Sequence, residues 1–399
     1  MNSRLTLGYL IPQFPGQTHI FFWREIAALE ARGVDVRIFS TRKPPPRLIS
    51  HGWSEEAIAR TEYLGAIKPL KALQTFLTLR PADWWADLRR EGRGLARDLA
   101  MSAAAAQQLR QSCAAQGITH LHVHSCGRAA LIAALARRMG GVPYSLTLHG
   151  PLSDYGPGQR LKWRHADFAT VITRKLRDEL PSALGPDLPS RVPIQPMGVD
   201  TDALRREAPY IPARPGEPLH IVSCGRLNAV KGHQDLMEAV RLLQDRGIDA
   251  RLEIAGEDDS GGHGFRTELE ARIKDLNLGD KITLLGAISG DEVKARLLSA
   301  HVFALASWHE PLGVAYMEAM SCGLPVIGTN AGGVPELITD GENGLLVPPR
   351  SPDALADAIA ALADDPDRAR QIATAGRAHV ERNFRSDLGA ETLIREIRA

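Results

Sequence analysis

Short apolar runs alternate with longer stretches of helical periodicity along the whole chain of 399 residues. The first strand is predicted at 5–11, followed by a loop rich in proline and glycine, a helix over 20–29 and a strand at 34–39. This order of elements is typical of the βαβ unit of a parallel sheet. Further strands are predicted at 118–124, 144–148, 169–172 and 192–196, and residues 55–112 are predicted to be mostly helical.

A second series of the same kind follows residues 205–218, whose four prolines indicate a linker. Its strands are predicted at 219–224, 252–255, 282–285, 302–306, 325–328 and 345–347, with helices starting near His233, Phe265, Gly290, Leu312, Pro335 and Pro352. We therefore expect an α/β protein with two doubly wound domains, over 1–200 and 201–384. A final helix at about 385–399 is expected to cross back to the first domain. Because ligands of such sheets bind beyond the carboxyl ends of the strands, a cleft between the two domains is the expected site.

The composition is that of an ordinary globular protein, with 44% hydrophobic and 24% charged residues and a net charge of +1. The charge is divided unevenly. Residues 1–200 hold 26 Lys and Arg against 16 Asp and Glu, a net of +10, so the remainder carries −9. The first half is therefore expected to face something anionic, such as nucleic acid, an anionic membrane or a phosphorylated lipid. The acidic second half argues against nucleic acid.

Several classes of protein are excluded by simpler features. The four cysteines lie far apart without a CxxC pair, which predicts neither a zinc site nor a disulfide framework. The first residues are too short and too interrupted for a signal peptide. Since no window of about 20 residues is continuously apolar, no transmembrane helix is expected. These features together predict a cytoplasmic protein.

The first loop with candidate chemistry, 224–232, follows a predicted strand in the second half. Arg226 and Lys231 place two cations at the start of a helix, an arrangement suited to a diphosphate. The alternative, a capped turn with solvated charges, is about equally common for such a loop.

The second loop, 308–318, carries Glu310 directly before Pro311, which suits the first turn of the predicted helix, and Glu318 within that helix. Free backbone amides at such a helix start attract an anion. A carboxylate in the otherwise apolar segment around Glu318 is costly to bury without a partner. The eight-residue spacing corresponds to about 12 Å along a helix, too far for two carboxylates to act on one bond. A third, glycine-rich turn follows at 329–336.

These motifs occur in order and together resemble the retaining, nucleotide-sugar-dependent glycosyltransferases of group 1, or family 4, which have the GT-B fold of two Rossmann-like domains. The resemblance is carried by Gly225-Arg226-Leu227 with Lys231-Gly232, by Glu310 with Glu318, and by Gly332-Gly333-Val334-Pro335-Glu336. The strand ends at Gly256 and Gly286 match the same layout. Relatives of this kind include bacterial exopolysaccharide and lipid-linked-sugar enzymes.

The resemblance implies a role for each residue of the second half. Arg226 and Lys231 would bind the donor diphosphate, and Glu310 would bind the donor sugar as a catalytic residue. The expected remaining donor contacts are the amides of Leu312, Gly313 and Val314 for the sugar, Glu318 for the ribose, and the loops after Gly256 and Gly286 for the base.

In the first half, the resemblance implies that His149 is a catalytic residue close to the reacting carbon. It also implies that Gly16, in a first loop at 15–18, binds near the donor phosphates, although this chain lacks the paired glycines of the family there. His122 is predicted to be a core residue.

The resemblance implies transfer of a hexosyl group from a UDP- or GDP-linked sugar to a glycan or lipid-linked acceptor, with retention of configuration. No cofactor and no metal are expected, because the Asp-x-Asp pairs at Asp200 and Asp365 are interpreted as structural. A non-catalytic nucleotide-sugar sensor and a sugar-nucleotide epimerase of the same fold are the alternatives. The basic segment 68–97, with Trp84 and Trp85, is interpreted either as a peripheral contact to an anionic membrane or as a packed amphipathic helix.

Overall fold

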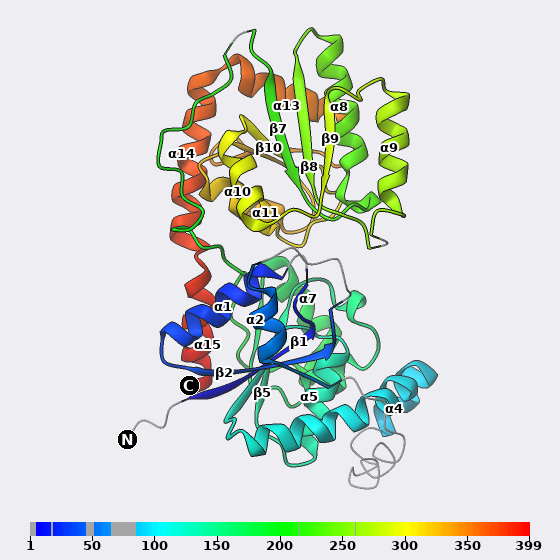
Figure 1. Cartoon of the computed structure of the whole chain (residues 1–399). Coiled ribbons are helices and arrows are strands. Elements are labelled where there is room, and N and C mark those ends of the chain that lie inside the picture. The colour runs from blue at the N-terminus through cyan, green and yellow to red at the C-terminus, as the bar shows by residue number, and fades with distance from the viewer. Residues whose placement is uncertain (1–4, 17–18, 45–51, 65–84, 215, 260) are drawn as a thin grey trace. The chain divides into compact units, whose positions relative to one another are not determined.

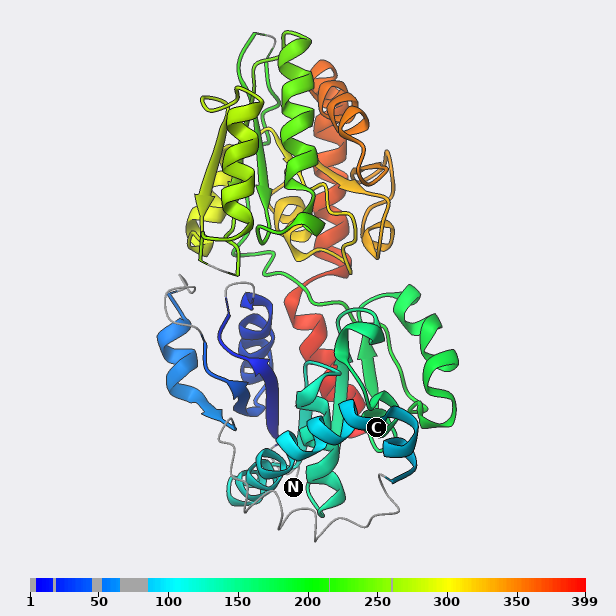
Figure 2. The ribbon, with the colours of Figure 1, turned by 90° about the vertical axis from the view of Figure 1, so that its right-hand side faces the viewer.

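The computed structural model describes residues 5–16, 19–44, 52–64, 85–214, 216–259 and 261–399. The chain forms two compact units. Among the described residues, the first unit contains those of 5–44, 53–196 and 387–399, and the second contains Gly52 and those of 197–386. Each unit is an α/β structure with helices on both faces of its sheet (Figures 1 and 2).

The first unit contains a parallel sheet of six strands in the order β3-β2-β1-β4-β5-β6. Its strands are β1 (Thr6–Gln13), β2 (Asp35–Arg42), β3 (Thr61–Tyr63), β4 (His120–Val123), β5 (Tyr144–Leu148) and β6 (Ala169–Val171). Leu7 of β1 lies opposite Val36 of β2 on one side and His120 of β4 on the other. This strand order is that of the dinucleotide-binding fold, in which ligands bind where the order reverses, here between β1 and β4.

The helices of the first unit cover both faces of this sheet. They are α1 (Ile20–Ala31), α2 (Ser54–Arg60), α4 (Trp85–Ala115), α5 (Arg128–Arg138), α6 (Gln159–Trp163), α7 (Arg174–Leu184) and α15 (Ser386–Arg398). Helix α5 is buried along its whole length from Ala129 to Ala136, because it packs between α4 and the sheet. Helix α4 is bent at Gly92, whose backbone leaves the helical region.

The second unit repeats the same topology. Its sheet order is β12-β11-β10-β7-β8-β9. Read from the β9 edge, and with β7 counted as the first strand, this order is again 3-2-1-4-5-6. The strands are β7 (Leu219–Cys224), β8 (Ala250–Ala255), β9 (Ile282–Gly286), β10 (Val302–Ala304), β11 (Val326–Thr329) and β12 (Leu345–Val347). All pairs are parallel, with Ile221 of β7 opposite Val302 and Leu252. The order reverses between β7 and β10.

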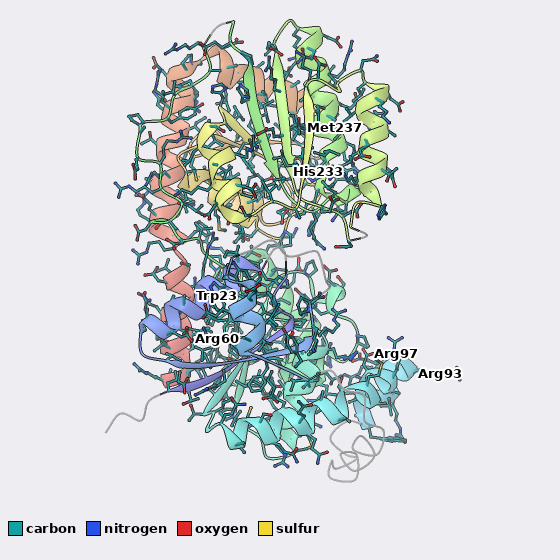
Figure 3. All side chains as sticks on the ribbon, in the orientation of Figure 1. Trp23, Arg60, Arg93, Arg97, His233 and Met237 are labelled. Carbon is teal, nitrogen blue, oxygen red and sulfur yellow. The ribbon has the colours of Figure 1, made fainter. Side chains whose placement is uncertain are left out.

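The helices of the second unit bury apolar side chains against this sheet. They are α8 (His233–Asp245), α9 (Phe265–Asp275), α10 (Gly290–Ser299), α11 (Val314–Ser321), α12 (Val334–Leu337), α13 (Pro352–Asp364) and α14 (Pro366–Asn383). Helix α8 packs beside α13 and α9, and its Leu236, Met237 and Val240 enter the core. Figure 3 shows Met237 and His233 on this helix.

Four sequence predictions differ from the structure. Residues 61–63 form the edge strand β3, not helix, and the predicted strand at 192–196 is reduced to one bridge between Val171 and Ile194. Two prolines in that segment remove the amides that a strand needs. The proline-rich stretch 205–218 is part of the second unit and not a free linker, since Tyr210 donates to the carbonyl of His301 at 2.7 Å. Helix α11 begins at Val314 and not near Leu312.

The final helix, α15, packs in the first unit. Arg32 at the end of α1 pairs with Asp387 at 3.1 Å and Glu391 at 2.7 Å. Thr392 is buried and donates to Gln195 at 2.7 Å. The chain therefore leaves the first unit after residue 196 and returns at residue 387.

In the described part of the chain, no helix has both the length and the apolar character needed to cross a membrane.

Candidate active site

The loop after β7 turns sharply into α8. Asn228 caps a short 3-10 turn by accepting the amide of Lys231 at 3.2 Å, and Leu227 is buried beneath the loop. Arg226 is exposed, and its neighbour Asp259, 3.9 Å away, is more exposed still. Lys231 points inward instead. The loop thus places one solvated cation and one partly buried cation at the carboxyl end of β7.

Lys231 forms an ion pair with Glu310, a residue 79 positions away in the sequence. The Nζ atom donates to Oε2 of the carboxylate, and Ser307 donates its hydroxyl to the same oxygen at 3.1 Å. Glu310 is only 8% exposed, so these two donors compensate the cost of burying its charge. The residues predicted to bind the diphosphate and the donor sugar are therefore neighbours.

The loop that carries Glu310 is held from two sides. The amide of Gly333 donates to the carbonyl of Glu310 at 2.9 Å, and a Cβ atom at Gly332 would lie only 2.0 Å from that carbonyl oxygen. On the other side, the indole of Trp308 donates to Asp235 of α8 at 2.6 Å. The glycine-rich turn predicted at 329–336 therefore packs against the loop of Glu310 and holds it in position.

Helix α11 starts two residues later than the expected position near Leu312. Gly313 has φ +101°, a value outside the helical region, and the first helical residue is Val314. The amides of Leu312 and Gly313 are consequently loop amides. Because Glu310 lies outside the helix, the expected separation of about 12 Å from Glu318, which assumed helical rise throughout, does not apply.

Glu318 is half-buried on α11 among buried neighbours, as the apolar segment predicted. It lies near two thiols, Cys224 at the end of β7 and Cys322 after α11. Burial first, and then the Glu318 carboxylate, raise the pKa of Cys224 to about 12 and that of Cys322 to about 11, while Lys231 acts in the opposite direction on Cys224. Glu318 and Lys231 are thus both close to the carboxyl end of β7.

Gly256 and Gly286 join the ends of β8 and β9. The amide of Gly256 donates to the carbonyl of Gly286 at 2.9 Å. Arg266 donates to Glu257 at 2.8 Å and to the carbonyl of Leu284 at 3.1 Å, which closes the adjoining loops. The side chain of Asp258 accepts three amides of the following loop, those of residues 262, 264 and 266, each at 2.9 Å. The loops predicted to border the base are therefore held together by several internal hydrogen bonds.

In the first unit, Gly16 and His149 lie after β1 and β5 respectively. Gly16 accepts the amide of His19 at 3.0 Å in the turn that leads into α1. Gln17 and Thr18 of the same predicted loop lie outside the described residues. His149 is half-buried, and burial lowers its pKa to about 3, so the imidazole is neutral near pH 7.

His122 is a core residue, as predicted. It is fully buried, and its two ring nitrogens bond to the hydroxyls of Ser145 at 2.8 Å and Thr147 at 2.8 Å. The sequence analysis missed a different contact, in which Nδ1 of His124 lies 3.2 Å from Nε2 of His149. The available signal was the spacing of two residues, which puts His122 and His124 on one face of the strand predicted at 118–124.

In each of the two Asp-x-Asp pairs, the side chain of the first aspartate accepts hydrogen bonds from backbone amides. Asp200 accepts the amides of Asp202 at 3.1 Å and Ala203 at 2.8 Å, and Asp365 caps α14 by accepting the amide of Arg368 at 2.9 Å. Within the described ranges, no group of three or more His, Cys, Asp or Glu side chains is arranged to hold a metal.

The basic segment of the first unit is described only from residue 85 onward. Lys68, Lys71, Arg80 and Trp84 lie outside the described residues. On α4, Arg89, Arg90, Arg93 and Arg97 are exposed, and the guanidinium of Arg89 lies over the exposed ring of Trp85. Figure 3 shows Arg93 and Arg97 projecting from this helix.

Two family profiles match adjoining parts of the chain. The profile described as glycosyl transferases group 1 matches residues 205–379, and that of glycosyltransferase family 4 matches residues 20–203. A GDP-mannose-dependent alpha-(1-6)-phosphatidylinositol monomannoside mannosyltransferase of Mycolicibacterium smegmatis is 33% identical, covering 62% of this chain and 68% of that protein. The chain belongs to the group 1, or family 4, glycosyltransferases.

Other proteins are similar to this glycosyltransferase over nearly its whole length. The WcaL glycosyltransferase of Escherichia coli, named for colanic acid biosynthesis, is 28% identical and covers 95% of this chain and 96% of its own. The crystal structure of Anabaena HepE in complex with UDP has a TM-score of 0.75 at 17% identity, covering 99% of this chain and 100% of that one. The latter similarity establishes the GT-B fold of two Rossmann-like domains.

Proposed function

We propose that this glycosyltransferase moves a hexosyl group from a nucleoside diphosphate sugar to a hydroxyl of a glycan or lipid-linked acceptor, with retention of configuration. The observation that carries the proposal is the contact between Lys231 and Glu310. It joins a cation for the diphosphate to a carboxylate for the sugar, at the ends of the paired strands β7 and β10. Retention is expected from the family resemblance.

The names of similar proteins support a nucleotide-sugar donor but differ in its base. HepE was solved with UDP and with UDP-glucose, whereas the Mycolicibacterium relative is GDP-mannose-dependent. We therefore propose a UDP- or GDP-linked hexose as donor. WcaL, named for colanic acid biosynthesis, supports an acceptor used in surface polysaccharide assembly.

In the proposed reaction, the bond between the anomeric carbon and the phosphate oxygen breaks, and its electron pair stays on the leaving diphosphate. Arg226 and Lys231 stabilise that charge together with the amides at the start of α11. The acceptor hydroxyl attacks from the face that the phosphate leaves, and its proton passes to a phosphate oxygen. Glu310 accepts hydrogen bonds from hydroxyls of the donor sugar, and Glu318 accepts them from the ribose.

The cationic loop gives the physical reason for proposing that no metal ion is required. A donor aimed at developing charge in a water-poor site contributes roughly 3–4 kcal/mol to the transition state. Lys231 is a partly buried cation of this kind, and the more exposed Arg226 and the start of α11 act in the same sense as a divalent ion on a diphosphate. Lys231 reaches the leaving group by exchanging its contact with Glu310 for one with phosphate, while sugar hydroxyls take its place on the carboxylate.

The proposal is tested by incubating the protein with UDP- and GDP-hexoses and an acceptor extract, and by following nucleoside diphosphate release and the anomeric proton by NMR. We expect release coupled to transfer, with an α-linked donor giving an α-linked product. A β-linked product would contradict retention. Binding of the nucleotide sugar without any turnover would favour the sensor, and a changed sugar still attached to its nucleotide would favour the epimerase.

We further propose that the exposed arginines of α4 contact an anionic membrane surface where a lipid-linked acceptor resides. Clustered Lys and Arg are worth about 1 kcal/mol each near such a surface. Flotation of the full chain with phosphatidylglycerol vesicles tests this, and absence of binding at low salt would contradict it.

A further inference from the structure

Glu25 is an almost completely buried carboxylate in the first unit, with 4% of its surface exposed. It projects from α1, where Tyr9 of β1 donates its hydroxyl to Oε2 at 2.5 Å. Helix α15 approaches from another side so closely that a Cβ atom at Gly389 would lie 2.3 Å from Oε1. A carboxylate enclosed in this way needs partners that favour its charge.

The second partner of Glu25 is His124, directly after β4, whose Nε2 lies 2.9 Å from the same carboxylate oxygen. The ring N–H is not aligned on that oxygen, so the carboxylate faces the N–H dipole of the ring without a linear hydrogen bond. On its other side, Nδ1 of His124 lies 3.2 Å from Nε2 of His149, and the two rings are inclined by 26° with their centroids 5.4 Å apart. A continuous chain therefore runs from Glu25 through His124 to His149.

The contacts determine where the protons of this chain lie, since hydrogen positions follow from the partners. Burial lowers the pKa of His124 to about 3, so that its ring is neutral and carries one proton. Burial raises the pKa of Glu25, but its Oε2 accepts the Tyr9 hydroxyl and faces His124 as an acceptor, which favours this proton on Nε2. Nδ1 of His124 is then an acceptor, and the proton between the two rings belongs to Nε2 of His149.

The remaining nitrogen of His149 is consequently an acceptor. Its Nδ1 has no partner among the described residues, and the side chain is half-buried at the end of β5, beyond which ligands of this fold bind. The other titratable groups around the chain are His122, whose nitrogens are both occupied by hydroxyls, Tyr9, and His19 from the turn before α1.

We propose that Glu25 is a positioning residue for His149. Through His124 it selects the tautomer of His149 in which Nε2 carries the proton, so that Nδ1 accepts a hydrogen bond from a hydroxyl of the bound sugar. This inference rests on the proposed function for the identity of that ligand, but the tautomer itself is a property of the ligand-free protein. Neutral imidazoles held in one tautomer by a carboxylate are effective in several enzymes, and their function suffers when the carboxylate is lost.

The tautomer is tested directly by long-range proton–nitrogen correlation NMR on protein labelled with ¹⁵N-histidine, with the His149 signals assigned by their loss in His149→Ala. We expect a protonated Nε2 and an unprotonated Nδ1 for His149 in the unmodified protein. In Glu25→Leu, which removes the charge and the acceptor, we expect a substantial population with the proton on Nδ1. Glu25→Gln keeps an acceptor oxygen and should lie between the two.

A kinetic experiment separates positioning from a structural role. Glu25→Leu should lower kcat by about 10- to 100-fold, the usual range for residues that orient a functional histidine, and should leave the KM for the nucleotide sugar within about 2-fold. In the His149→Ala background the same change should have no further effect on kcat. Glu62→Gln is the matched control, because Glu62 accepts bonds from Gln108, Ser112 and Gln116 elsewhere in the unit.

Three results would overturn the inference. They are a proton on Nδ1 of His149 in the unmodified protein, no change of tautomer in Glu25→Leu, or independent and multiplicative effects of Glu25→Leu and His149→Ala. If Glu25→Leu does not fold, the unmodified protein and Glu25→Gln still decide the tautomer. If no nucleotide sugar is turned over, the proposed function fails, whereas the NMR result remains decisive for Glu25.

Discussion

Lys231→Ala is expected to lower the rate of sugar transfer by about 100- to 1,000-fold, the usual cost of removing one preorganised group that stabilises developing charge. It is also expected to destabilise the second unit. Glu310 would lose its cation while remaining 8% exposed, and an uncompensated charge of this kind costs up to about 3 kcal/mol. Steady-state kinetics and thermal unfolding measure the two effects.

The double variant Lys231→Ala/Glu310→Gln separates the effect on the transfer rate from the effect on stability. Removing the carboxylate charge as well should restore most of the thermal stability, because no buried charge is left unpaired, but it should not restore transfer. Lys281→Ala is the control, since Lys281 forms an ion pair with Asp249 in the same unit, away from the site. Near-normal transfer by Lys231→Ala would contradict the role of Lys231 in stabilising the leaving diphosphate.

Gly332→Ala is expected to disable the enzyme without touching any charged residue. Gly332 has φ +66°, and a Cβ atom there would lie 2.0 Å from the carbonyl oxygen of Glu310. The left-handed conformation costs about 1–2 kcal/mol for alanine, and overpacking adds roughly 1–3 kcal/mol. The Glu310 loop should shift to relieve the clash, so we expect both a lower melting temperature and a transfer rate reduced by at least about 10-fold.

Gly247→Ala provides a matched control for this prediction. Gly247 has a similar φ of +80°, but nothing lies within 4 Å of the position that a Cβ atom would take. Only the conformational cost of about 1–2 kcal/mol should appear, with full transfer activity. Equal losses of activity in the two variants would show that the close approach of Gly332 to Glu310 has no functional consequence.

The elements that could be predicted are those with strong local signals. Helices α8, α9, α10 and α13 begin at the predicted residues, because glycine, serine and proline mark their starts. β3 was missed because it has three residues and lies directly after a helix, so no periodicity could reveal it. The start of α11 was placed too early because Pro311 suits a first turn, while the conformation of Gly313 that delays the helix is not visible in sequence.

The residues of the candidate site were predicted from motifs, but their contacts were not. The roles of Arg226, Lys231, Glu310 and Glu318 stay predictions, and the ion pair between Lys231 and Glu310 depends on the packing of two loops that are distant in the chain. Glu25 was missed for a similar reason. In sequence it is one acidic residue in an amphipathic helix, and only burial against Tyr9 and His124 distinguishes it from a surface residue.

The most direct test of the donor site is a crystal structure of the protein with bound UDP or GDP. We predict that the diphosphate lies against Arg226 and Lys231, with Lys231 withdrawn from Glu310, and that Glu318 accepts hydrogen bonds from the ribose hydroxyls. A nucleotide bound away from the carboxyl ends of β7 and β10, with the Lys231–Glu310 pair intact, would contradict the assignment.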